Sequence, residues 1–323
     1  DTTDDERRAT DQPTTDTAGD GRQTAIGNDR GDTTDLPVPA MVTEERPGEP
    51  LRRDSVGALS ESAFRTLASD LGRSLARLHA LDAVESFGYL AVADESRAGS
   101  VPPADPETLR VVDPESDWRA RVRADAADEL SRLAETRFAD LRESLSAALD
   151  AAPAALTGPF RPALAHVDAS PENHCWDPQR ERVTGVLDWA FTVAAPPGYD
   201  LAYAGQTLGG GHWTLLPDRP DRRDEAFKAV LAGHLDAEPE SGGPLERTDA
   251  GVVVGAATDG ARLTTEQVVE QARANRDAYR TLMAVRTCNL FEGWFDWWGV
   301  EAWERETAAE ALRERVERVV GGG

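Results

Sequence analysis

The sequence predicts an α+β protein in which helices dominate and the few strands are short. From residue 60 onward, most segments repeat apolar side chains every three or four positions, which is the period of an amphipathic helix. Two apolar runs near the middle of the chain, Pro162–Ala165 and Val183–Leu187, have the length of one buried strand, and each ends in a polar turn. A largely helical unit with short hairpin strands is therefore expected.

The first 35 residues differ from the rest of the chain. Ile26 is their one large apolar residue, and most of the others are Thr, Asp, Arg, Gly or Ala. Such a segment cannot bury enough apolar surface to offset the entropy lost on ordering. We expect residues 1–35 to form a disordered acidic segment. Residues 36–59 connect this segment to the helices, and Leu36–Val42 within them is expected to be extended and interrupted by prolines.

Helical periodicity fills much of the chain after residue 59. Ser60 can cap the first helix, because its hydroxyl can accept a hydrogen bond from the first free backbone amides. Its apolar stripe is Phe64, Leu67, Leu71, Leu75 and Leu78. Further helical segments are expected at Ser116–Asp150, Asp221–Leu235, Thr264–Asn289 and Ala302–Val319. The Glu-, Gly- and Pro-rich segment Ala237–Gly260 is expected to be a loop that could carry a hairpin around Val252–Val254.

Composition restricts the class of protein. The 323 residues carry a formal net charge of −24, which disfavours binding to nucleic acid or to an anionic membrane. Lys228 is the only lysine, and such acidity throughout the chain is typical of proteins from extreme halophiles, so it says little about a substrate. Two cysteines do not make a disulfide framework. The sequence has neither an apolar signal segment nor an apolar run long enough for a membrane span, which favours a soluble cytoplasmic protein.

Three oxygen-bearing side chains on the two polar turns indicate phosphoryl transfer. A carboxylate such as Asp168 can accept the proton that an attacking hydroxyl must lose. Mg²⁺ prefers oxygen ligands and usually takes one or two from the protein, and Asn173 and Asp188 are ligands of that kind. His166 lies two residues before the proposed base and is expected to fix the loop by hydrogen bonding. The pattern predicts a Mg²⁺-dependent transfer of a phosphoryl group from a nucleotide to a hydroxyl or an amine.

Other interpretations of the same residues remain open. Asp188 could simply cap a strand, and Asp168 could be the first residue of an Asx-turn. His166, Asp168 and His174, with Cys175 as a further candidate ligand, could instead bind zinc, although a second His or Cys cluster at the usual spacing is missing from the sequence.

Several motifs, in order along the chain, resemble one family. The chain is similar to kinase-like small-molecule phosphotransferases, which include aminoglycoside phosphotransferases and choline kinases. That family has a His-Gly-Asp-x-x-x-x-Asn loop, then a strand that ends in Asp-Trp or Asp-Phe, then a Tyr-Asp-Leu-Ala-like helix start. The matching segments here are His166–Asn173, Leu187–Trp189, Tyr199–Ala202, the helical Leu75–Asp82, and Pro47–Leu51 after the hinge between lobes.

The resemblance implies a role for each matching residue. Asp168 would be the base, Asn173 and Asp188 would bind magnesium, and Glu44 near the hinge would contact the nucleotide. Asp200 matches a position that braces the catalytic loop. Val167 replaces the usual glycine and could crowd the backbone beside the base.

The resemblance also implies a two-lobed, protein-kinase-like fold. Residues 60–323 would form the mostly helical large lobe, and residues 36–59 a hinge and a remnant of the small lobe. The small lobe's β-sheet, glycine-rich loop and lysine have no counterpart in the sequence, so the N-terminal β-lobe is expected to be truncated. The resemblance implies two hypotheses: an ATP- and Mg²⁺-dependent phosphotransferase that acts on a hydroxyl of a small molecule, or a catalytically inactive binding or scaffold module or truncated gene product.

Aromatic residues near the C-terminus could bear on the acceptor. Phe291, Trp294, Phe295 and Trp298 fall on one face of a helix, with Trp297 and Trp303 nearby. Core packing is the preferred interpretation of this stripe. In the resembled family the C-terminal helices wall the acceptor site, so an exposed part of the stripe could hold a flat or cationic acceptor.

Overall fold

The structure is a computed structural model, and it describes residues 48–81, 83–92, 109–237 and 263–321. These residues all belong to one compact unit, Thr43–Gly323. The predictions for residues 1–35, for Leu36–Val42, for Glu44 and for the Val252–Val254 hairpin lie outside the described residues.

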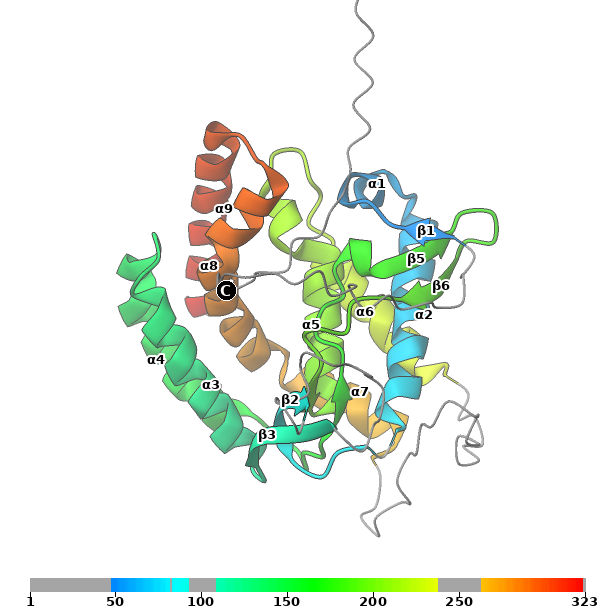
Figure 1. Cartoon of the computed structure of the whole chain (residues 1–323), viewed down its shortest axis with the longest axis horizontal. Helices are drawn as coiled ribbons and strands as arrows, with labels where there is room; N and C mark the ends of the chain where they lie inside the picture. Colours follow the sequence, from blue (N-terminus) through cyan, green and yellow to red (C-terminus); the bar gives the residue numbers. More distant parts are fainter. Residues whose placement is uncertain (1–47, 82, 93–108, 238–262, 322–323) are drawn as a thin grey trace, which may run out of the picture. The chain divides into compact units, whose positions relative to one another are not determined.

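Helices make up most of the described chain, and the α+β prediction is confirmed (Figure 1). The α-helices are α1 Arg53–Ala58, α2 Glu61–His79, α3 Trp118–Leu133, α4 Arg142–Ala155, α5 Pro197–Gly210, α6 Arg223–Leu235, α7 Thr265–Ala274, α8 Arg276–Trp298 and α9 Ala302–Val320. Short 3₁₀ helices are η3 Ala139–Leu141, η4 Pro171–Asn173 and η5 His212–Leu215. The strands are β1 Glu49–Pro50, β2 Phe87–Val92, β3 Leu109–Glu115, β4 Ala163–Ala165, β5 His174–Asp177, β6 Arg182–Val186 and β7 Val193–Ala195.

Helices α2, α5 and α6 form the support beneath the polar loops (Figure 1). The predicted cap of α2 is confirmed, because the Ser60 hydroxyl accepts a hydrogen bond from the Ala63 amide at 3.1 Å. Helices α2 and α6 cross so closely that a side chain at Gly72 would collide with the carbonyl of Val230, and one at Gly233 with the carbonyl of Ser69. Glycine at both positions therefore allows this close approach.

The predicted helix Ser116–Asp150 is wrong in one respect, because the structure divides it into α3 and α4, which pack against each other. Side-chain hydrogen bonds of Thr136 accompany the interruption. The Thr136 hydroxyl donates to the Leu133 carbonyl at 2.9 Å and accepts from the Phe138 amide at 3.2 Å. Phe138 is then fully buried with its ring centroid 5.2 Å from that of Phe291.

The predicted helical segment Thr264–Asn289 is likewise two helices. They meet at Asn275, whose amide oxygen accepts from the Thr157 backbone amide at 2.7 Å and whose amide nitrogen donates to the Thr157 carbonyl at 2.9 Å. Helix α8 then continues past the expected end to Trp298. The expected helices at 221–235 and 302–319 match α6 and α9 closely.

Two small antiparallel sheets position the polar turns. Their strand orders are β3-β2-β7-β4 and β1-β5-β6. Strand β4 pairs with β7, and β5 pairs with β6. Residues 166–173 connect β4 to β5, while residues 187–192 connect β6 to β7. Both connections therefore run between the same two strand pairs, which forces them to lie side by side.

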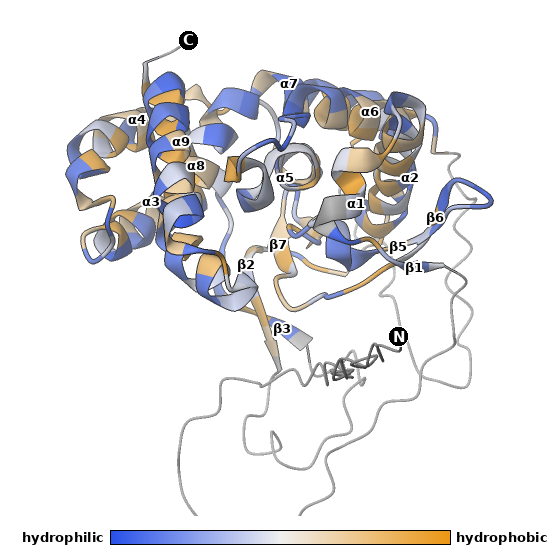
Figure 2. Cartoon of the chain, turned by 90° about the horizontal axis from the view of Figure 1, so that it is seen from above, coloured by the Kyte–Doolittle hydropathy of each residue, from blue (hydrophilic) through white to orange (hydrophobic). Residues whose placement is uncertain are grey.

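Strand β7 is mostly buried, whereas the turn between β5 and β6 is exposed. Ala194 and Ala195 of β7 are almost completely buried. Figure 2 shows the same contrast, with a hydrophobic β7 and a hydrophilic turn beside β6. Among the described residues, no helix is both long and apolar enough to cross a membrane.

The aromatic residues of α8 and the start of α9 have two environments. Phe291 and Phe295 are completely buried, as the core-packing interpretation predicts. Trp297 and Trp303 are exposed by 70% and 63%. The buried phenylalanines belong to the core, while the exposed indoles leave an aromatic surface at the end of α8.

Candidate active site

Asp168 lies in the loop between β4 and β5 and is half-buried. Its Oδ1 accepts hydrogen bonds from the Ser170 hydroxyl at 2.6 Å and from the Ser170 amide at 3.2 Å. This is the Asx-turn geometry that the alternative interpretation described. The turn fixes one carboxylate oxygen, so the direction of the other oxygen is also fixed.

Asn173 and the residue before Asp188 are joined by hydrogen bonds. The Asn173 amide nitrogen donates to the Asp168 carbonyl at 3.1 Å, and the Leu187 amide donates to the Asn173 carbonyl at 2.8 Å. On its other side, the Leu187 carbonyl lies 3.0 Å from Nε2 of the buried His166. The loops that carry Asp168, Asn173 and Asp188 are therefore in direct contact.

Asp188 lies at the exposed end of β6. Its φ of 53° is left-handed, a conformation that aspartate tolerates better than most residues. Its Oδ1 accepts from the Ala190 amide at 3.2 Å. The neighbouring Trp189 ring meets the His166 ring edge to face at 4.7 Å. The Asp188 carboxylate thus stands on a short rigid turn that is open to solvent.

Asp200, near the start of α5, holds the backbone before Asp168. The amides of His166 and Val167 each donate to its carboxylate at 2.9 Å, and His79 Nε2 lies 3.0 Å from it. Burial opposes ionisation of Asp200, but hydrogen bonds from His79 and from both amides outweigh it and lower the pKa of the carboxyl group. These are the contacts expected of a residue that braces the loop.

Val167 adopts the strained backbone that its position requires. Its φ is 51°, in the left-handed region, where a β-branched side chain is unfavourable by about 1–2 kcal/mol. Glycine would adopt this φ without that penalty. The crowding predicted from the sequence is therefore present as backbone strain, and the Asp200 bonds hold it in place.

A buried polar network that joins α3, α5 and α8 was not predicted from the sequence. Arg286 of α8 donates to Glu129 at 3.0 Å and to the Tyr199 hydroxyl at 2.7 Å, and lies 3.4 Å from Asp125. Burial raises the pKa of the Tyr203 phenol, and the positive charge of Arg286 and its hydrogen bond to the phenol offset part of that rise. A usable signal was the i, i+4 pair Asp125 and Glu129 on a face of α3 that also carries apolar residues.

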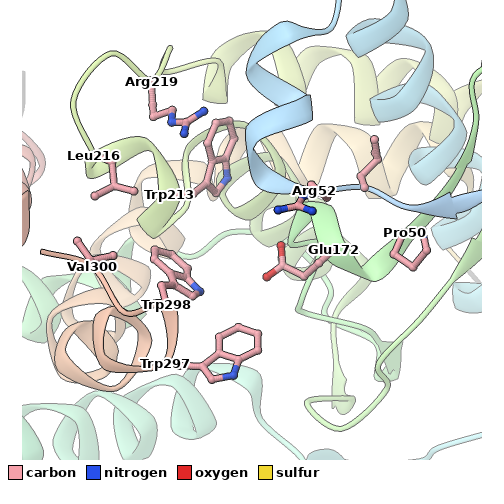
Figure 3. A pocket seen from close by; sticks show the side chains of 10 residues that line it. Pro50, Arg52, Glu172, Trp213, Leu216, Arg219, Trp297, Trp298 and Val300 are labelled. Carbon is pink, nitrogen blue, oxygen red and sulfur yellow. The ribbon is translucent and has the colours of Figure 1, made fainter. Parts of the chain in front are cut away.

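A pocket of about 480 Å³ opens beside the catalytic loop (Figure 3). Its charged residues include Glu172, four positions after Asp168, and its walls are mainly aromatic and aliphatic. The lining residues are Pro50, Leu51, Arg52, Glu172, Trp213, Leu216, Arg219, Trp297, Trp298 and Val300. An aromatic wall at α8 was the alternative to core packing in the sequence, and the contributions of β1 and η5 were not predicted.

The structure does not bring the residues of the alternative zinc site together. His174 is fully buried and its Nδ1 lies 3.0 Å from the Ser170 carbonyl. Across the described residues, no three His, Cys, Asp or Glu side chains gather closely enough to hold a metal ion. The proposed magnesium ligands Asn173 and Asp188 are not such a group, because there are two of them and one is an amide.

We expect the buried His234, which lies 3.3 Å from His79, to make the protein less stable in acid. Burial, together with the nearby His79, lowers the pKa of His234 from 6.5 to about 3, although Asp200 acts in the opposite direction. The unfolded chain therefore takes up a proton at this residue below pH 6.5, while the folded protein does so only near pH 3. The free energy of unfolding should fall as the pH drops through this interval.

Urea unfolding at a series of pH values measures this effect. His234→Gln cannot titrate, so the loss of stability between pH 6.5 and 3 should be shallower in that variant. An equally steep loss in the variant would assign the acid sensitivity to other groups.

The helical unit, its two small sheets and the paired polar loops define a kinase-like phosphotransferase fold. A profile of the phosphotransferase enzyme family matches residues 24–242, which is more than half of the chain. The chain therefore belongs to this family. No curated protein matches the chain.

Solved structures also match, 86 chains in all. One is the macrolide 2′-phosphotransferase MphH from Brachybacterium faecium, with 21% identity, 83% of this chain and 68% of that chain covered, and a TM-score of 0.36. Another is a thermostable mutant of aminoglycoside phosphotransferase APH(4)-Ia with ADP and hygromycin B, with 16% identity, coverages of 86% and 71%, and a TM-score of 0.45. The gentamicin–APH(2″)-IIa complex shows 16% identity, coverages of 83% and 67%, and a TM-score of 0.39.

Proposed function

We propose that this chain transfers the γ-phosphoryl group of ATP to a hydroxyl group of a small molecule, in a reaction that requires Mg²⁺. The observation that carries the proposal is the hydrogen-bonded contact between the two polar loops. Leu187, the residue before Asp188, donates to Asn173, whose side chain donates to the Asp168 backbone. A base and two oxygen ligands on adjoining rigid loops suit phosphoryl transfer, which depends mainly on positioning and electrostatics.

Asp168 is the proposed base. Its Oδ1 is occupied by the Ser170 bonds, so Oδ2 is the oxygen that would accept the proton of the acceptor hydroxyl. His166 is assigned a positioning role, because its amide is held by Asp200 and its ring contacts the Leu187 carbonyl. It would keep the two loops together during the reaction.

Asn173 and Asp188 suit a magnesium ion in the chemistry of their donor atoms. The Asn173 amide nitrogen is used in the bond to the Asp168 carbonyl, which directs the amide oxygen away from that bond. Asp188 adds an exposed carboxylate. Two oxygen donors from protein, with phosphate and water completing the shell, are what Mg²⁺ usually takes. Bound there, the ion would neutralise charge on the phosphates.

We propose that the acceptor enters the pocket beside Glu172. The pocket combines a carboxylate four residues from the proposed base with indole rings of Trp213, Trp297 and Trp298 (Figure 3). Aromatic faces and a nearby carboxylate favour an apolar or cationic body that carries the reacting hydroxyl. Because tryptophan lines this pocket, fluorescence provides a screen for the acceptor. The proposed setting is a salt-rich cytoplasm, which the net charge of −24 supports.

Calorimetry with ATP and Mg²⁺ tests the proposal. We expect binding heat that disappears when Mg²⁺ is chelated and that is strongly reduced in Asp188→Asn, because that substitution removes a charged ligand. Asp177→Asn is the control, since this carboxylate pairs with Arg180 away from the two loops. Absence of heat at millimolar nucleotide would instead support an inactive binding module.

A further inference from the structure

Three buried side chains from three helices form a hydrogen-bonded row that ends at the catalytic loop. His234 of α6 lies 3.3 Å from His79 of α2, measured from Nε2 to Nδ1. His79 Nε2 lies 3.0 Å from the Asp200 carboxylate of α5. The side chains of His79 and Asp200 are exposed by only 4% and 2%, and His234 by 2%. Water therefore cannot take over a hydrogen bond that one of these side chains loses.

The chemistry of Asp200 fixes the direction of these bonds. An ionised carboxylate can only accept, so His79 Nε2 must donate to it. In a neutral His79 the other ring nitrogen, Nδ1, is then an acceptor, and the proton between the two rings must belong to Nε2 of His234. His234 Nδ1 is left without a proton. That nitrogen is buried with no hydrogen-bond partner within the described part of the chain, so this tautomer avoids burying an unsatisfied N–H group.

The far end of the row carries strain. Asp200 accepts from the amides of His166 and Val167, and Val167 is held at a φ of 51°. A strained backbone of this kind persists only where its surroundings over-determine it. Asp200 can hold this backbone only while its own carboxylate is fixed. The side chain that hydrogen-bonds to the carboxylate and fixes its orientation is His79. His79 in turn is oriented by His234.

We propose that His234 is a positioning residue, which sets the tautomer and orientation of His79 and through it the Asp200 brace of the catalytic loop. The close crossing of α2 and α6 at Gly72 and Gly233 brings the two histidines within bonding distance. The consequence for catalysis rests on the proposed function, because it assumes that Asp168 is the base. The brace itself can be measured without any activity.

Amide hydrogen exchange at the loop tests the brace. His234→Leu removes the donor, and we expect the His166 and Val167 amides to exchange about tenfold faster or more, because His79 loses the hydrogen bond that orients it toward Asp200. His234→Gln keeps an N–H group near the position of Nε2 and should retain most of the protection. Val230→Ala shortens a fully buried side chain of the same helix outside the row and is the control for general destabilisation.

Nitrogen NMR of the wild-type protein gives an independent readout. His79 and His234 should both carry their proton on Nε2, with an unprotonated Nδ1 on His234. A proton on Nδ1 of a neutral His79 would overturn the proposal, as would equal exchange of the two loop amides in His234→Leu and Val230→Ala.

Kinetics separate the brace from its catalytic consequence. With an acceptor from the screen, His234→Leu should lower kcat about tenfold with little change in the KM for ATP, and His234→Gln should restore it. Faster exchange with an unchanged kcat would reject the catalytic role and keep the brace. A wild-type protein without transferase activity would reject the proposed function, while the exchange experiment would still decide the brace.

Discussion

Asp168→Asn is expected to abolish phosphoryl transfer while the fold stays intact. The amide cannot accept the proton of the acceptor hydroxyl, and losing a positioned base typically lowers kcat by about 10²–10⁴-fold. The asparagine Oδ1 can still accept from the Ser170 amide and hydroxyl, so the turn should survive. The loss is measured as the rate of phosphoryl transfer from ATP to the acceptor, detected by the release of ADP.

Two controls separate loss of the base from loss of the loop. The urea midpoint of Asp168→Asn should match that of the wild type, and Mg²⁺–ATP should still bind, because Asn173 and Asp188 are untouched. Ser170→Ala, which removes the 2.6 Å bond but leaves the carboxylate, should lower kcat much less. Retained turnover in Asp168→Asn would remove this residue from the base role.

Arg286→Met is expected to cause a large loss of stability, of about 3–5 kcal/mol, because it removes the nearest cation of the buried Glu129 carboxylate, whereas Asp125 keeps its ion pair with Arg121 at 2.6 Å. Arg286 contacts Glu129 and Asp125, whose side chains are exposed by only 6% and 7%. Methionine fills a similar volume, so the cost arises mainly from uncompensated charge. The free energy of unfolding from urea titration at fixed salt measures this loss.

Matched variants identify the origin of the Arg286 effect. Arg273→Met removes an exposed arginine that lies 3.9 Å from Glu270, and should change stability by less than about 0.5 kcal/mol. Adding Glu129→Gln to Arg286→Met should recover part of the loss, because it neutralises one of the buried carboxylates. A loss no larger than that of Arg273→Met would mean that the network does not depend on the arginine.

The elements predicted from the sequence were those whose signals are local. The cap at Ser60 and the apolar period of α2 predicted that helix, and both are present. The predicted helix Ser116–Asp150 is interrupted after Leu133, where the Thr136 hydroxyl accepts from the Phe138 amide and donates to the Leu133 carbonyl, and Phe138 is fully buried. Helical periodicity continues across such a break, because the side chains on both sides still face the same core. Only the tertiary contact reveals it.

The candidate site also has parts that the sequence predicted and parts that it did not. Asp168, Asn173 and Asp188 were recognisable because their types and spacing on two turns suit one chemistry. The Arg286 network, the pocket and the His234–His79–Asp200 row each join residues that are far apart in the sequence, so no short motif contains them. The aromatic stripe of α8 lies between these cases, since its period predicted burial of Phe291 and Phe295 but not that Trp298 lines a pocket with Trp213 of η5.

By itself, the sequence determined which parts of the chain become helices, where the two polar turns lie, and which family the chain belongs to. The reason is that helix period, turn chemistry and the chemical types of the site residues are all properties of short segments. Tertiary structure alone decided that the two turns meet, because β4 pairs with β7 and β5 with β6. It also decided that Val167 is held in a strained conformation by Asp200, since that bond depends on where α5 packs.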